Sequence, residues 1–372
     1  METVVEAAVL HRLSMPLRLP FETSYGREER RELLLVEVRT PDGDMGWGEC
    51  VAQARPLYSP ETVDTAALML VREILPRVLG RPWSHPAEVW EWLTPVRGHP
   101  MAKFALEGAV WDLYARRLGR PLAAVLGGTR QEVAAGVSLG MAPLSALLDQ
   151  VRGWVERGYR RVKIKIAPGR DRETLAALRQ AFPGLALMAD ANGAYRWPQD
   201  AARLEALDDL DLLMLEQPFP PEDWEAHAAL QARLRTPLCL DESIGSLAEA
   251  RRAVALGACR VINVKPGRLG GFTPALALEA WARQAGVPLW CGGMLETGVG
   301  RALNVALASL PGFTLPGDLS ASERYWEEDI IDPPVTLTPD GTIRVPEAPG
   351  AGWTVDPRRL ARYERWSRTL RV

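Results

Sequence analysis

Short apolar runs recur along the middle of this chain at a nearly constant interval, and this repeat restricts the possible folds more than any other feature. The runs end every 24 to 27 residues, at positions 138, 165, 190, 216, 241, 265, 291 and 315. Stretches of helical period, such as 172–180 and 247–255, separate them. Eight strand-then-helix units predict an α/β fold, a parallel (β/α)8 barrel of the TIM type. A doubly wound open sheet is the alternative, but its glycine fingerprint after the first strand is missing.

The flanking segments do not follow this repeat. Before the barrel, apolar residues at 32–38 precede a Pro-Asp-Gly turn, and a helical pattern follows at 103–115. After it, a second Pro-Asp-Gly sequence at 339–341 predicts a hairpin over 335–345. We therefore predict a barrel over 129–322 and an α+β capping domain that residues 1–128 form together with the returning segment 323–372.

Composition and charge restrict the possible partners. The net charge is -3 and no long basic run occurs, which argues against nucleic acid or an acidic membrane as a partner. No apolar segment approaches the length of a membrane span, and the first residues do not resemble a signal peptide. The four cysteines show no CxxC spacing. We expect a cytoplasmic protein that acts on small molecules.

Charged residues stand at the ends of five consecutive predicted strands. In a barrel of this type the chemistry takes place at the carboxyl ends of the strands. Three carboxylates there would repel one another and raise their own pKa values unless a cation lay between them. An oxygen-only set without histidine or cysteine favours Mg²⁺ or Mn²⁺ over zinc. The residues are Lys163 and Lys165, then Asp190, Glu216, Asp241 and Lys265.

The lysines are distinctive because only four of the 44 basic residues are lysine, and two of these lie in the sequence RVKIKI at 161–166. An isolated strand of this pattern would place its lysine face in water. Arginine, however, supplies surface charge elsewhere in this chain, and only lysine can act as a base near neutral pH. The four histidines lie away from the barrel-strand ends. Burial, a like-charged neighbour and a divalent ion would lower the lysine pKa from about 10.4 toward roughly 7 to 8, so Lys165 and Lys265 are candidate bases.

These motifs resemble the enolase superfamily, in its muconate-lactonising branch, and most closely the group of o-succinylbenzoate synthases and N-acylamino acid racemases. The resemblance covers nearly the whole chain. It implies a magnesium-dependent enzyme that removes a proton next to a small-molecule carboxylate through an enediolate. The expected reaction is dehydration, racemisation of N-acyl or N-succinyl amino acids, or both, in a homo-oligomer. It also implies that Asp190, Glu216 and Asp241 bind the metal, that Lys165 and Lys265 act as acid and base, and that Lys163 steadies the substrate carboxylate.

The same resemblance suggests where the substrate pocket lies. A loop at 21–26 would close over the distal part of the substrate, and glycines at 292 and 293 could offer amide groups to a carboxylate. Without the resemblance, these segments would be ordinary strand connections. The pocket candidates are Tyr25, Gly26, Ser138, Asn192, Gly293, Met294 and Tyr325.

Other functions remain open at this point. Acid-sugar dehydratases that resemble mandelate racemase carry a histidine at the seventh strand, where this chain has none. Dipeptide epimerases carry an Asp-x-Asp motif near the eighth strand, where this chain offers only Asp318. An ammonium-free substrate therefore fits better than a dipeptide, although an epimerase or a cycloisomerase remains an alternative. A Schiff-base aldolase that uses Lys265 is a second class. A scaffold that binds no metal is the third.

Overall fold

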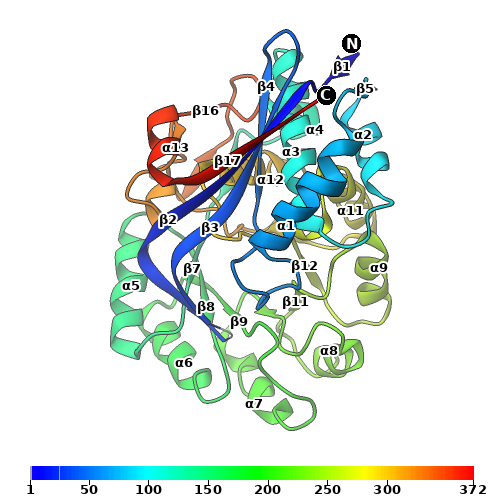
Figure 1. Cartoon of the computed structure of the whole chain (residues 1–372). Coiled ribbons are helices and arrows are strands. Elements are labelled where there is room, and N and C mark those ends of the chain that lie inside the picture. Colours follow the sequence, from blue (N-terminus) through cyan, green and yellow to red (C-terminus); the bar gives the residue numbers. More distant parts are fainter. Residues whose placement is uncertain (1, 25) are drawn as a thin grey trace.

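The computed structural model describes residues 2–24 and 26–372, and its centre is a curved parallel sheet surrounded by helices (Figure 1). Seven neighbouring strands form this sheet in chain order: β7 (Val137–Leu139), β8 (Arg161–Lys165), β9 (Ala186–Asp190), β10 (Leu215–Glu216), β11 (Leu238–Leu240), β12 (Val261–Val264) and β13 (Leu289–Cys291). The helices that follow them are α5 (Leu144–Glu156), α6 (Arg172–Ala181), α7 (Ala201–Glu205), α8 (Trp224–Gln231), α9 (Leu247–Ala255), α11 (Phe272–Ala285) and α12 (Gly298–Ala308). The predicted barrel repeat is confirmed for these seven units.

The prediction of an eighth regular strand is wrong. Residues 313–319 form no regular strand, although they occupy the position that closes the barrel. The Thr314 amide donates to the Leu289 carbonyl at 3.1 Å on one side, and the Gly136 amide donates to the Leu319 carbonyl at 3.2 Å on the other. Pro316 has no amide hydrogen to continue a ladder, so the segment closes the barrel through separate hydrogen bonds.

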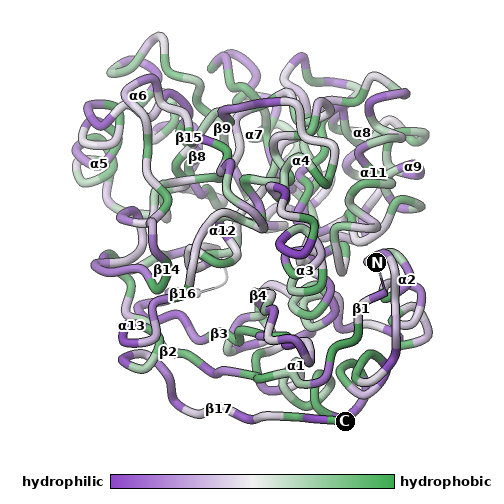
Figure 2. The backbone as a smooth tube through the Cα atoms, turned by 90° about the horizontal axis from the view of Figure 1, so that it is seen from above, coloured by the Kyte–Doolittle hydropathy of each residue, from purple (hydrophilic) through white to green (hydrophobic). Residues whose placement is uncertain are grey.

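A four-stranded antiparallel sheet forms the base of the cap, in the order β17, β2, β3, β4, with β17 at the outer edge (Figure 2). The strands are β2 (Ala7–Thr23), β3 (Gly26–Arg39), β4 (Met45–Cys50) and β17 (Glu364–Arg371). Helices α1 (Val63–Met69), α2 (Pro86–Leu93) and α3 (Pro100–Arg117) complete the cap. Because β17 pairs with β2 along its length, the end of the chain returns to the cap. The boundaries at 128/129 and 322/323 stay predictions.

The hairpin predicted at 335–345 does not form as expected. Its turn is present, since the Thr338 amide donates to the Thr342 carbonyl at 2.8 Å. Only the second arm is a strand, β15 (Thr342–Arg344), and it pairs with β6 (Glu132–Ala134) at the start of the barrel region. The first arm instead bonds to the segment near Ser322, whose amide donates to the Val335 carbonyl at 2.8 Å.

Helix α3 lies directly against strand β4, and two glycines make this approach possible. A Cβ atom added at Gly46 or Gly48 would lie 2.2 Å from the Ala109 carbonyl oxygen or 2.0 Å from that of Ala105. Any larger residue would push the helix away from the strand. The close packing thus fixes the sheet and helix α3 of the cap against each other. No helix of the described residues is long and apolar enough to cross a membrane.

Candidate active site

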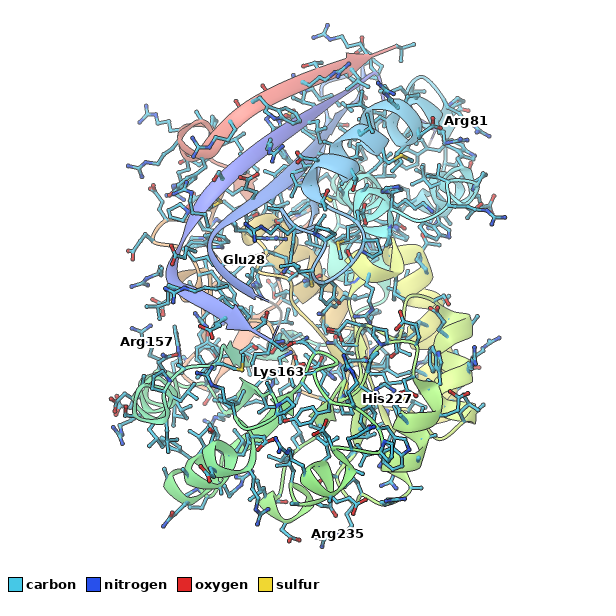
Figure 3. All side chains as sticks on the ribbon, turned by 60° about the horizontal axis from the view of Figure 1, so that its bottom comes forward. Glu28, Arg81, Arg157, Lys163, His227 and Arg235 are labelled. Carbon is cyan, nitrogen blue, oxygen red and sulfur yellow. The ribbon has the colours of Figure 1, made fainter. Side chains whose placement is uncertain are left out.

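The charged side chains predicted at the strand ends meet in the interior of the barrel mouth. Lys163 lies where the β2–β3 hairpin approaches the barrel strands (Figure 3). Both lysines of the β8 strand are buried, with exposed fractions of 3% for Lys163 and 8% for Lys165. The three carboxylates lie deeper still, at 0% for Asp190 and Glu216 and 1% for Asp241. The alternative of a lysine face in water is therefore wrong.

Lys165 and Lys163 share the Asp190 carboxylate of the next strand, and Lys163 also contacts Glu216 one strand further. The Lys165 ammonium lies 2.6 Å from Oδ2 of Asp190 and 2.7 Å from Oδ1 of Asn192. The Lys163 ammonium lies 3.0 Å from the same Asp190 oxygen and 2.9 Å from Oε2 of Glu216. Parallel pairing sets this arrangement, because Lys165 is the register partner of Asp190 and Asp190 that of Glu216.

Lys163 has a third carboxylate partner, Asp318, in the segment that closes the barrel. The Lys163 ammonium lies 2.6 Å from Oδ2 of Asp318, and Nη1 of Arg161 donates to the other oxygen at 2.5 Å. Arg161 is fully buried and stacks beside Trp290. Burial would raise the pKa of Asp318, but the charges of Lys163 and Arg161 outweigh it and hold this pKa well below its usual range. Both carboxylate oxygens of Asp318 are thus already paired with positively charged side chains of this protein.

Lys265 forms a separate group on the other side of the mouth. Its ammonium lies 2.7 Å from Oδ2 of Asp241 and 3.2 Å from the hydroxyl of Tyr58, a residue of the cap. The Tyr58 hydroxyl also lies 3.1 Å from Oδ1 of Asp241. Arg268 donates to the same Asp241 oxygen. The cap therefore contributes a side chain to the hydrogen bonds of this lysine.

Of the three carboxylates, only Glu216 has the raised pKa that the sequence predicts, because neighbouring cations of the chain lower the pKa values of Asp190 and Asp241 despite their burial. Burial, with the negative charges of Asp190 and Asp241, raises the pKa of Glu216 to about 8 despite the nearby Lys163. Burial by itself would lower the pKa of Lys265, but the Asp241 carboxylate outweighs it and raises this pKa, contrary to the lowering that we expected. No group of three His, Cys, Asp or Glu side chains in the described residues has the arrangement of a metal site. The lysine ammonium groups lie against the carboxylate oxygens.

A cavity of about 330 Å³ opens above these charges, between the cap and the barrel. All three lysines of the site line it, whereas the three carboxylates lie beneath its wall. The described pocket candidates also line this one cavity: Gly26, Ser138, Asn192, Gly293, Met294 and Tyr325. Residues far apart in sequence are thus brought together, since Gly26 and Tyr325, 299 positions apart, share this wall.

One part of the pocket prediction needs correction. Residues 21–23 belong to strand β2 and β3 begins at Gly26, so the connection is much shorter than the predicted loop at 21–26. Tyr25 lies outside the described residues. The hairpin nevertheless touches the barrel, because the Met141 amide donates to the Glu22 carbonyl at 3.0 Å. The tip of the cap sheet thus forms part of the cavity wall.

Comparison with known proteins agrees with this arrangement. Residues 146–359 match the family described as enolase C-terminal domain-like, and residues 5–127 match the mandelate racemase / muconate lactonizing enzyme N-terminal domain. The chain belongs to the enolase superfamily. The resemblance expected from the sequence motifs is confirmed, and so is the combination of a barrel with an N-terminal cap.

Individual members of the superfamily show how close the similarity is. An o-succinylbenzoate synthase of Geobacillus kaustophilus is 50% identical over 365 residues, which cover 98% of this chain and 97% of that protein. An N-succinylamino acid racemase of Thermus thermophilus is 50% identical over 367 residues, covering 98% and 99%. A solved enolase superfamily structure from Listeria innocua has a TM-score of 0.95 at 40% identity and covers 99% of both chains.

Several residues of the site were not predicted. Asn263 on strand β12 donates to Oε1 of Glu216 at 2.7 Å, and its place two residues before Lys265, which follows that strand, could have revealed it. Tyr58 and Arg161 gave no such signal. Tyr58 lies in a cap segment without periodicity, and Arg161 is one arginine among many.

Proposed function

We propose that this enolase superfamily enzyme removes and returns the proton on the carbon next to a substrate carboxylate. One observation carries the proposal: Lys165 ends strand β8, Lys265 directly follows strand β12, and both line the same cavity. Three strands separate β8 from β12 in the sheet. In a barrel of eight positions, this separation puts the two amines on opposite sides of the mouth. A carbon held between them would meet one amine on each face.

We further propose that Asp190, Glu216 and Asp241 bind a divalent cation, Mg²⁺ or Mn²⁺. The donors fit such an ion, because all are carboxylate oxygens at the carboxyl ends of three adjacent strands, and burial together with the charges of Asp190 and Asp241 raises the pKa of Glu216 to about 8. When bound, the cation would stabilise the negative charge of the enediolate. Binding would require the ammonium groups of Lys163, Lys165 and Lys265 to turn away from these three carboxylates and toward the substrate.

We assign the proton transfers and the binding of the substrate carboxylate to lysine side chains of the site. One lysine, in its neutral form, takes the α-proton, and the opposite lysine, as an ammonium, supplies a proton to the other face. Burial alone would lower the pKa of Lys163, but the charges of Asp318, Glu216 and Asp190 raise it, so this amine is charged, as the proposed role beside the substrate carboxylate requires. Asn192, which holds Lys165 at 2.7 Å, would orient that amine.

For the substrate, we propose the reactions named for its relatives: o-succinylbenzoate synthesis by dehydration, racemisation of N-succinyl or other N-acyl amino acids, or both. The paired state of Asp318 supports a substrate without a free ammonium group, since both oxygens already contact cations of the chain. This pairing disfavours a dipeptide epimerase. A cycloisomerase stays an alternative, and no contact among the described residues of the site favours an aldolase or a scaffold.

Three broader expectations remain part of the proposal. We propose a cap of residues 1–128 and 323–372 on a barrel of 129–322, and a homo-oligomer as the resemblance implies. We propose a cytoplasmic location, which the four buried free cysteines support. No nucleic acid or membrane is expected among the partners.

Single lysine variants test the proposed mechanism. The native enzyme should racemise an N-succinyl amino acid and exchange its α-proton with deuterated solvent from both enantiomers. Lys165→Ala and Lys265→Ala should each stop racemisation, while each still exchanges one enantiomer, and a different one. Rates should be compared across pH, because loss of a charged neighbour changes the pKa of the remaining lysine. Equal exchange of both enantiomers by both variants would show that the two lysines do not serve opposite faces.

A further inference from the structure

A glutamate of the cap, Glu49 on strand β4, lies at the start of barrel helix α12. Its side chain is fully buried. One oxygen accepts from the Thr297 amide at 3.1 Å, and the other accepts from the Thr297 hydroxyl at 2.6 Å and the Gly300 amide at 2.9 Å. A Cβ atom at Gly300 would lie 2.9 Å from this second oxygen, so a residue without a side chain is required there. One carboxylate thus joins a cap strand to the amino end of a barrel helix.

The turn immediately before α12 forms part of the cavity wall. Residues 293–295 line the cavity, and Leu295 has a φ angle of 59°, which is unusual for a branched residue. The Glu296 carboxylate accepts from the Met294 amide at 2.8 Å and from the Asn304 side chain at 2.8 Å. A backbone conformation of this kind persists only where its surroundings hold it. The cap contributes one of these supports, through Thr297.

The turn also touches one of the two proposed bases. The sulfur of Met294 lies 3.5 Å from the Lys265 ammonium nitrogen. Lys165 has no such contact, since its polar partners are Asp190 and Asn192. Movement of the turn would therefore affect the Lys265 side of the cavity first.

We propose that Glu49 is a positioning residue: from the cap, it holds the turn at 293–297 and so keeps Lys265 aligned with its face of the substrate. The proposal rests on the two-lysine function above. It predicts an asymmetric defect, because loss of Glu49 should impair proton exchange at the Lys265 face more than at the Lys165 face.

The chain offers a matched control in Glu107. This glutamate is also fully buried, also comes from the cap, on α3, and also caps a barrel helix, α11. It accepts from the Phe272 amide at 2.7 Å, the Thr273 amide at 2.8 Å and the Thr273 hydroxyl at 2.6 Å. None of these residues lines the cavity. Glu107 therefore has the structural role of Glu49 without a contact to the turn at 293–297 or to the cavity wall.

The experiment compares Glu49→Gln with Glu107→Gln in the full-length enzyme. Glutamine retains the shape but offers only one acceptor oxygen, so one helix amide loses its partner. Deuterium exchange is measured for each enantiomer of an N-succinyl amino acid with magnesium, and thermal unfolding is measured in parallel. Both variants should unfold at lower temperature. Only Glu49→Gln should change the ratio of the two exchange rates, by about threefold or more against the enantiomer that Lys265 serves.

A second pair of variants keeps the test valid if Glu49→Gln does not fold. Thr297→Val removes the hydroxyl that bonds to Glu49 and should shift the ratio in the same direction, whereas Thr297→Ser keeps the hydroxyl and should not. An unchanged ratio in Glu49→Gln and Thr297→Val, or an equal change in Glu107→Gln, would overturn the proposal. If the native enzyme exchanges neither enantiomer, the proposed function itself fails, which is a different result.

Discussion

The hydroxyl group of Tyr58, on the cap, lies 3.2 Å from the ammonium nitrogen of Lys265 at the end of strand β12. The same hydroxyl lies 3.1 Å from the Asp241 carboxylate, so a cap side chain touches both a proposed base and a proposed metal ligand. Burial raises the pKa of Tyr58, and the charge of Asp241 adds to this, so the phenol stays neutral at physiological pH. The active site therefore depends on the cap for more than the enclosure of its substrate.

Tyr58→Phe should lower kcat/KM by about tenfold, because it removes a hydrogen bond to charged groups while it keeps the aromatic ring. The measurement is steady-state turnover of an N-succinyl amino acid, with thermal unfolding as a check on the fold. Tyr114→Phe is the control, since Tyr114 packs against Trp111 and His85 in the cap and does not line the cavity. Full activity in Tyr58→Phe would show that its hydroxyl does not help to align Lys265.

Magnesium should stabilise the native enzyme against heat, and a chelator should inactivate it reversibly. Binding to the folded state alone raises stability in proportion to the logarithm of ligand concentration. Glu216→Gln removes the central ligand and should abolish both turnover and stabilisation by magnesium, without unfolding. Glu242→Gln, a change at a neighbouring half-buried carboxylate that accepts from the Asn192 side chain, should keep the magnesium-dependent shift. The metal assignment is wrong if Glu216→Gln keeps near-native turnover at ordinary magnesium concentrations.

Much of the barrel and the strand-end chemistry could be predicted from local pattern. Parallel strands place their carboxyl ends at one edge, so a charge at each end indicates a common site even when the residues lie far apart in sequence. Lys165, Asp190 and Glu216 follow this rule, with Lys165 paired in register with Asp190 and Asp190 with Glu216. The helix predicted at 247–255 coincides with α9, where the Ser246 hydroxyl accepts from the Glu249 amide at 3.2 Å.

What the sequence could not predict depends on contacts between distant segments. Tyr58 reaches Lys265 across 207 positions, and Arg161 reaches Asp318 across 157. No periodic pattern encodes such pairs. The prediction of an eighth strand failed because the segment 313–319 closes the barrel through separate hydrogen bonds on both of its sides and needs no regular ladder. The prediction of a hairpin at 335–345 failed because the Val335 carbonyl accepts from the Ser322 amide and does not pair with a neighbouring strand.

Asp318→Asn should strongly destabilise the protein, because it leaves the fully buried Arg161 without its carboxylate. Removal of one partner of a buried ion pair typically costs about 3 to 5 kcal/mol. Arg161→Met in the Asp318→Asn background should recover part of this loss, since it removes the unpaired charge. Chemical denaturation of the four proteins in this cycle measures the coupling. Additive effects would show that the Arg161–Asp318 pair does not contribute as a unit.

His227 on helix α8 should make the protein less stable in mild acid. It is fully buried, its Nδ1 lies 2.7 Å from the Asp223 carbonyl oxygen, and its Nε2 lies 3.3 Å from the Phe219 amide nitrogen, so the neutral ring donates to one and accepts from the other. Burial lowers the pKa of His227 to about 4, despite the opposing effect of Asp223.

The sign of this effect follows from the two protonation states. Between about pH 6.5 and pH 4 the unfolded chain binds a proton at this histidine and the folded chain does not. The stability that His227 contributes is therefore complete above about pH 6.5 and is lost as the pH falls toward 4, a change on the order of 3 kcal/mol. His227→Gln keeps a donor and an acceptor but cannot titrate, so its free energy of unfolding should fall less than that of the native enzyme over this range. Parallel curves for the two proteins would mean that His227 is already charged in the folded state, or that it is not buried as described.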